Sequence, residues 1–83
     1  MHLQRLDLTS LSLSLFTLFT LFTLVARTCS ISQGAALAHL AIGAASQRIT
    51  DLEAAVGVTL LERHSRGART TTAGQVLFAF HSR

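Results

Sequence analysis

Residues 46–63 read SQRITDLEAAVGVTLLER, in which apolar residues recur at helical spacing before the chain turns into a short extended segment. When the pattern is followed back to residue 42 and each residue advances the helix by about 100°, the apolar side chains fall on one stripe of roughly 80°. We therefore predict a core-facing helix over about 42–56, ended by Gly57 in the left-handed conformation that commonly stops a helix. The stripe consists of Ile42, Ala45, Ile49, Leu52 and Val56.

The opposite side of this helix is predicted to be exposed. Gln47 lies near the middle of the exposed arc and Ser46 at its edge. The remaining residues of the arc are Gly43, Ala44, Thr50 and Asp51.

A β-hairpin with a basic tip is predicted after this helix. The residues VTLLERHSRGARTT contain two short extended segments, about 59–63 and 68–71, which are joined through Ser65-Arg66-Gly67. Arg63, Arg66 and Arg69 fall within seven residues. Such a cluster is either a solvated turn or a site for a polyanion, because the guanidinium group matches the geometry of phosphate.

Two capping-box patterns mark further helix starts. Ser30-Ile-Ser-Gln33 predicts a short helix over about 32–38, and Thr72-Ala-Gly-Gln75 opens a last amphipathic segment. The fold class is therefore mainly α, a winged helix-turn-helix with a short β-hairpin wing and the start of a linker helix. The second helix of such a pair lies in the major groove of DNA, and phosphate contacts hold it in register.

Composition narrows the function classes. The 83 residues form at most one small domain. Its formal net charge is +3, and the sequence contains no lysine, so all of its fixed positive side chains are arginines. The lone Cys29, interpreted as a buried thiol, fits a reducing compartment and a cytoplasmic location. No nucleophile with a base, carboxylate pair or phosphate-cradling loop emerges, so we expect no enzyme and no cofactor. No metal site is expected either, because the spacing of the four histidines is unsuitable: His2, His39, His64 and His81.

The chain resembles the amino-terminal DNA-binding domain of LysR-type bacterial transcriptional regulators. The most specific match is the block S-x-x-I-x-x-L-E-x-x-x-G-V-x-L-x-E-R from Ser46 to Arg63, supported by RGAR in the wing and TTTAGQ after it. The resemblance implies sequence-specific binding to double-stranded DNA, with residues 42–56 in the major groove and residues 59–71 on the phosphates. It also implies a homodimer, formed in the intact family member through the first helix and the linker helix.

The resemblance divides the chain into a winged helix-turn-helix domain over residues 1–71 and a truncated linker or dimerisation helix over residues 72–83. The effector domain of the family is expected to be absent. Where the family often has Ser-Gln-Pro, this chain has Ala41-Ile42-Gly43, so Gly43 either permits a close approach to DNA or serves helix-start packing. The candidate DNA-binding residues are Ser32, Gln33, Gly43, Ser46, Gln47, Arg48, Thr50, Arg66 and Arg69.

A long uncharged run precedes all of these motifs, from Leu8 to Ala26, with Leu-Phe-Thr repeated three times. Its length approaches the ~20 residues of a membrane span, so the alternative function is a small membrane-associated protein anchored by residues 8–26. An export signal is a further interpretation. Removing residues 14–21 restores the spacing of the family, which favours a first helix lengthened by tandem duplication. Seven hydroxyl side chains in the run also make it a marginal membrane span.

Overall fold

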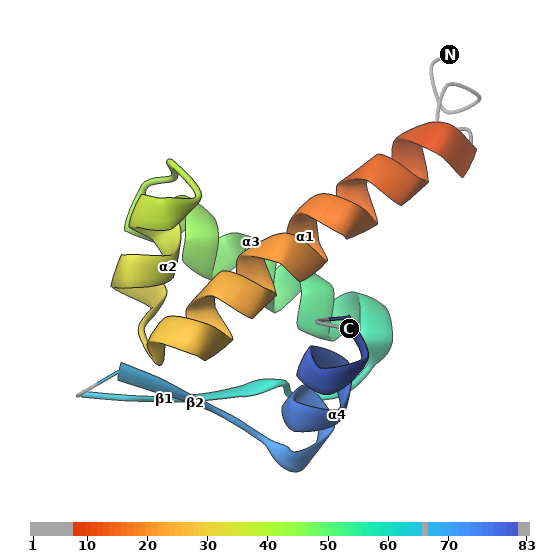
Figure 1. Cartoon of the computed structure of the whole chain (residues 1–83). Helices are drawn as coiled ribbons and strands as arrows, with labels where there is room; N and C mark the ends of the chain where they lie inside the picture. Colours follow the sequence, from red (N-terminus) through yellow and green to blue (C-terminus); the bar gives the residue numbers. More distant parts are fainter. Residues whose placement is uncertain (1–7, 66, 82–83) are drawn as a thin grey trace.

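The computed structural model describes residues 8–65 and 67–81, with side chains from residue 15 onward. It contains four helices and one antiparallel hairpin in the order predicted for a winged helix-turn-helix (Figure 1). The elements are α1 (Leu8–Thr28), α2 (Ile31–Leu37), α3 (Ile42–Val56), β1 (Leu61–His64), β2 (Gly67–Thr70) and α4 (Thr72–His81). The predicted fold class is confirmed.

The core lies where α1 and α3 meet, with α2 packed against both helices. Phe22 and Val25 of α1 are fully buried, as are Ile49 and Leu52 of α3. The middle of the predicted α3 stripe is thus confirmed, including Ala45.

The two ends of the stripe are not part of the core. Ile42 is 55% exposed and Val56 is 41% exposed, so their prediction as core residues was wrong. They are the first and last residues of α3, and Val56 borders an apolar groove beside α4 instead of being covered.

The α1–α2 turn is tied to the wing. Cys29 has a φ of 56°, and its carbonyl oxygen accepts a hydrogen bond of 2.9 Å from the Ala68 amide. The Cys29 side chain is exposed, so the prediction of a buried thiol was wrong. The reason is that the turn buries the backbone of Cys29 against β2 and leaves its side chain outside.

Glycine allows the close packing of α1 and α2. An added Cβ at Gly34 would lie 2.5 Å from Val25 Cγ2 and 2.9 Å from Val25 Cα. Real Cβ atoms essentially never approach backbone this closely. Gly34 therefore sets the distance between the two helices.

One of the two predicted helix caps forms, and at the other helix start a neighbouring residue is the cap. The Ser30 hydroxyl accepts from the Gln33 amide at 3.0 Å, but the Ser30 amide donates to the Val25 carbonyl, so the reciprocal half of this box is not made. At α4 the cap is Thr71, whose Oγ1 accepts from the Gly74 amide at 3.0 Å. The prediction of Thr72 as the cap was wrong because Thr72 is already the first helical residue.

The hairpin strands are offset from their predicted positions. Leu61 pairs with Thr70 and His64 with Gly67. β1 begins two residues later than predicted, and β2 has the predicted length but begins one residue earlier. Thr59 and Leu60 precede β1, and the Leu60 amide donates to the Glu53 carboxylate.

The uncharged amino-terminal run forms one continuous helix, α1, whose first part extends beyond the other elements in Figure 1. Among the described residues no helix is long and apolar enough to cross a membrane, so the interpretation as a membrane anchor is not supported. The segment predicted to be surplus, residues 14–21, reaches into the core. Leu21 is only 2% exposed, and Leu18 and Phe19 pack against the buried cluster.

Candidate nucleic-acid interface

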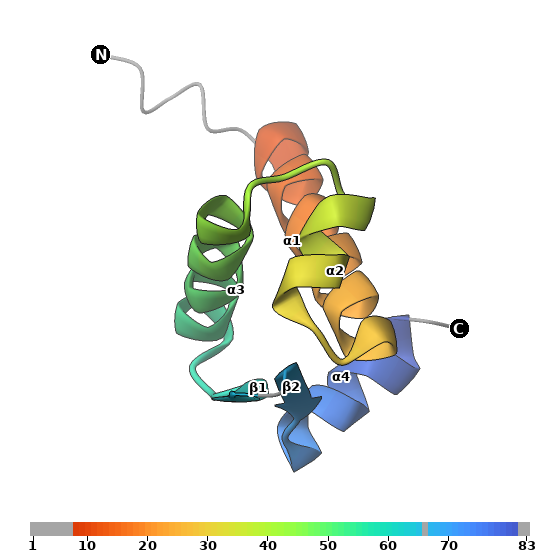
Figure 2. The ribbon, with the colours of Figure 1, turned by 90° about the vertical axis from the view of Figure 1, so that its left-hand side faces the viewer.

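The outer face of α3 is open. Figure 2 shows α3 at the edge of the molecule, with α1 and α2 on one side of it and the hairpin at one end. A Cβ added at Gly43 would meet no atom within 4 Å. The predicted arc is confirmed as exposed, and Ser46 at its edge is half-buried. The exposed residues are Gly43, Ala44, Gln47, Arg48, Thr50 and Asp51.

Arg63 of β1 connects the wing to this helix. Its Nη1 donates to Ser46 Oγ at 2.6 Å, and its Nη2 donates to Ser46 O at 3.4 Å and to Thr50 Oγ1 at 3.3 Å. Thr50 Oγ1 also donates to Ser46 O at 3.1 Å. Two predicted DNA-binding residues, Ser46 and Thr50, are thus held together by a third residue.

Sequence reasoning placed Arg63 in the basic cluster but not among the site residues. Strand alternation could have identified it, because successive side chains point to opposite faces of a strand. Leu61 is buried, so Arg63, two residues later, lies on the same face of β1 and reaches α3.

A second connection between α3 and the wing is partly buried. Glu53 Oε2 accepts hydrogen bonds from the amides of Leu60 at 2.8 Å and Leu61 at 3.1 Å. This carboxylate binds the backbone donors of the residue before β1 and of the first residue of β1. The position of the hairpin relative to α3 is therefore set by one acidic and one basic side chain.

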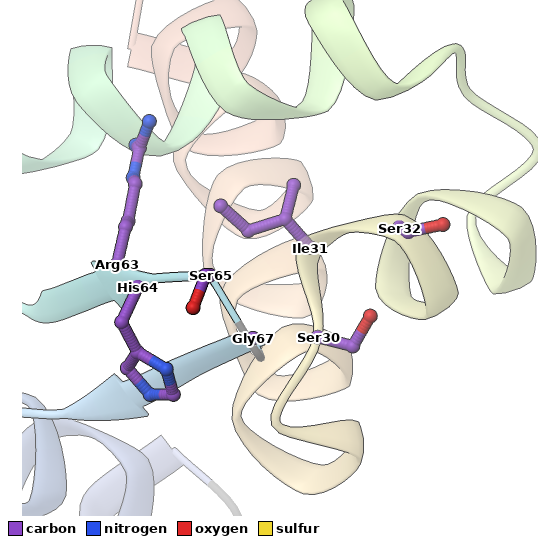
Figure 3. A pocket seen from close by; sticks show the side chains of 7 residues that line it. All are labelled: Ser30, Ile31, Ser32, Arg63, His64, Ser65 and Gly67. Carbon is purple, nitrogen blue, oxygen red and sulfur yellow. The ribbon is translucent and has the colours of Figure 1, made fainter.

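A hollow of about 330 Å³ lies between the start of α2 and the hairpin (Figure 3). Ser32 lines it together with Arg63, while His64 points to the other side of β1 in the figure. The structure therefore brings the start of α2 next to the tip of the hairpin. Gln33 is exposed outside this hollow. The lining residues are Ser30, Ile31, Ser32, Arg63, His64, Ser65 and Gly67.

Of the other wing arginines, Arg69 does not join this group. Arg66 lies outside the described residues. Arg69 is exposed on β2 and is the cross-strand partner of Glu62, whereas Arg63 is the partner of Ala68. Because partners in an antiparallel pair share a face, Arg69 and Arg63 lie on opposite faces of the hairpin.

The assembled surface offers hydrogen-bonding groups. It combines guanidinium donors with hydroxyl and amide groups that both donate and accept. Within residues 8–65 and 67–81, no group of three or more histidine, cysteine or acidic residues is arranged to hold a metal ion. A helix face and an adjoining hairpin with such groups can contact the base edges and phosphates of a nucleic acid.

Comparisons with known proteins agree with this geometry. The sequence model described as the bacterial regulatory helix-turn-helix protein of the lysR family matches residues 16–75. That span begins after residues 8–15, the part of α1 that extends beyond the other elements. No curated protein matches the chain.

Several solved structures share the fold. The DNA-binding domain of CbnR in complex with DNA is 31% identical, with a TM-score of 0.78, over 82% of this chain and 78% of that one. Vibrio fischeri DarR in complex with DNA is 29% identical, with a TM-score of 0.75, over 80% of this chain and 23% of that one. The BenM DNA-binding domain in complex with catB site 1 DNA is 31% identical, with a TM-score of 0.71, over 75% of this chain and 69% of that one.

Full-length CbnR in complex with its target DNA is also similar, at 31% identity and a TM-score of 0.78, but this chain spans only 24% of its length. The shared part is the helix-turn-helix and wing described above. On its family match, its identity to solved relatives and its fold, this chain belongs to the lysR family of bacterial regulatory helix-turn-helix proteins.

Proposed function

We propose that this chain is the sequence-specific DNA-binding domain of a LysR-type bacterial transcriptional regulator. In this proposal α3 enters the major groove, and residues 59–71 lie along the phosphates. The observation that carries it is the open outer face of α3, fixed to the wing by Arg63 and Glu53. The similarity to CbnR, DarR and BenM, each solved with DNA, supports it.

The exposed side chains have distinct roles in this proposal. Gln47 reads a base, because a glutamine amide can pair with the N6 and N7 edge of adenine. Ser46 and Thr50 contact the DNA in the orientation that Arg63 gives them. Gly43 allows the start of α3 to approach closely. The remaining candidates, which contact the sugar-phosphate backbone and set the register, are Ser32, Gln33, Arg48, Arg66 and Arg69.

We also propose a second copy of the chain as a partner. Val76 and Phe80 of α4 are 67% and 75% exposed, and they border an apolar groove of about 220 Å³. On α1, Phe16 is 63% exposed, and its ring lies 6.4 Å from that of His81 at the end of α4. The exposed apolar surface thus extends over α1 and α4, which supports a homodimer through the first helix and the start of the linker helix.

The proposed activity is binding rather than catalysis. A regulator that contacts bacterial DNA acts in the compartment that holds the DNA, so we propose a cytoplasmic location. The sensing of a small effector by the family's second domain does not enter the proposal for this chain.

Selection from a pool of random DNA duplexes tests the function. We expect the chain to enrich particular sequences, and Gln47→Ala to reduce discrimination between a selected site and random DNA by about 1–3 kcal/mol. The matched control is Gln75→Ala, the same substitution at an exposed position of α4. Absence of any enrichment by the unmodified chain would refute the proposal, and equal losses on selected and random DNA would make Gln47 a positioning residue.

A further inference from the structure

The outer face of α3 carries a hydrogen-bonded pair at its centre. Gln47 Nε2 donates to Asp51 Oδ1 at 2.9 Å, and both residues are exposed. One helical turn before them lie Gly43, which has no side chain, and Ala44, which has only a methyl group, so the pair is left uncovered. Any nucleic acid that approaches this face therefore meets the Gln47 amide together with the Asp51 carboxylate.

The Asp51 carboxylate fixes the orientation of the Gln47 side-chain amide. An ionised carboxylate only accepts hydrogen bonds, so the NH₂ group of Gln47 faces Asp51 and the carbonyl Oε1 is turned away from it. One of the two amide N–H groups is used by Asp51. The pair then presents outward one acceptor, Oε1, and one remaining donor.

We propose that Asp51 is a positioning residue that sets the base specificity of Gln47. The remaining donor and acceptor match adenine, which presents the N7 acceptor and the N6 donor in the major groove. Guanine presents two acceptors, N7 and O6, and so leaves Oε1 facing an acceptor without a proton between them. Asp51 thereby favours adenine over guanine at the base that Gln47 meets.

The carboxylate has a second consequence. It places a negative charge on the face that approaches the phosphates, and like charges repel most at low salt. DNA without a matching base gains nothing that offsets this repulsion. Asp51 therefore lowers the affinity for random DNA, while Gln47 maintains the affinity for the selected site.

This inference rests on the proposed function, and substitution of Asp51 separates the two. Asp51→Asn keeps the shape of the side chain but can donate as well as accept, so both orientations of the Gln47 amide become available. In selections from the random duplex pool, we expect the preference for adenine over guanine at one position to fall by about tenfold. Affinity for random DNA should rise at low salt.

Three further variants sharpen the test. Asp51→Ala removes the partner altogether and should relax the same base preference, and alanine is the residue most compatible with a helix. Glu62→Gln removes one negative charge from the wing, so it should raise the affinity for all sequences alike and leave the base preference unchanged. In a Gln47→Ala background, Asp51→Asn should no longer change the adenine preference, because the residue it positions is gone.

The outcomes are distinguishable. If the unmodified chain enriches a site and Asp51→Asn keeps the same base preference at every position, the inference is refuted and the proposed function stands. If the preference shifts equally in the Gln47→Ala background, Asp51 reads the base itself and is not a positioning residue. If the unmodified chain enriches no sequence, the proposed function and this inference fail together.

Discussion

Removal of the Glu53 carboxylate should detach the wing from α3 and destabilise the whole domain. Glu53 Oε2 accepts from the amides of Leu60 and Leu61, whose residues are 2% and 4% exposed. A buried donor left without a partner costs about 1–3 kcal/mol, so Glu53→Ala should cost about 2–6 kcal/mol for the two amides. A domain of this size has a total stability of only about 4–12 kcal/mol.

Glu53→Gln provides the internal comparison. Its amide oxygen can still accept from both backbone donors, so only the charge is lost and we expect a cost of about 1 kcal/mol. The exposed Glu62→Ala should change stability by no more than about 0.5 kcal/mol and controls for the loss of an acidic residue.

Thermal and urea unfolding, followed by circular dichroism, measure these differences. A loss of 2 kcal/mol should lower the Tm of a domain of this length by about 8–16 °C. If the Tm of Glu53→Ala stayed within about 2 °C of the unmodified chain, the two hydrogen bonds would not hold the wing, and the reasoning would be wrong.

Three further predictions address the phosphate contacts, the helix packing and the long first helix. Arg69→Ala should flatten the slope of log affinity against log salt by about 0.9, and an unchanged slope in salt titrations would remove this residue from the contacts. Gly34→Ala should cost about 1–3 kcal/mol in urea unfolding, because its Cβ would lie 2.9 Å from an α1 Cα atom, whereas Gly43→Ala has open space and should stabilise slightly. Deleting residues 8–15 should leave stability nearly unchanged, since the α1 side chains that pack on the core remain. Deleting residues 14–21 should cost about 1–3 kcal/mol, because a serine then takes a core-facing position of α1. Equal stabilities of the two deletion variants in urea unfolding would contradict this.

The repeated Leu-Phe-Thr units illustrate how a sequence pattern can fit several structures. Composition alone left a membrane span, an export signal and a lengthened helix open. The structure gives one helix in which Phe22 and Val25 are buried, and the Thr23 hydroxyl donates to the Phe19 carbonyl at 3.0 Å. A threonine that bonds back to its own helix is compatible with a partly buried face.

The sequence by itself determined the local features of this protein. The centre of α3, its stop at Gly57 and the Ser30 cap follow from helical periodicity, glycine in the left-handed region and hydrogen bonds between near neighbours. All of these depend on residues only a few positions apart. The order of helices and hairpin followed from them, and so did the exposure of Gln47.

Tertiary structure decided which side chains at the ends of the elements are covered and which distant residues are joined. Cys29 is exposed because its backbone binds Ala68 of the wing, and Ile42 at the start of α3 is exposed although it lies on the apolar stripe. Arg63 binds Ser46, seventeen residues earlier in the chain, a contact that no local pattern specifies. Burial at the element ends and long-range hydrogen bonds depend on how the elements pack against one another, and local periodicity indicates which face of a helix is covered but not which residues cover it.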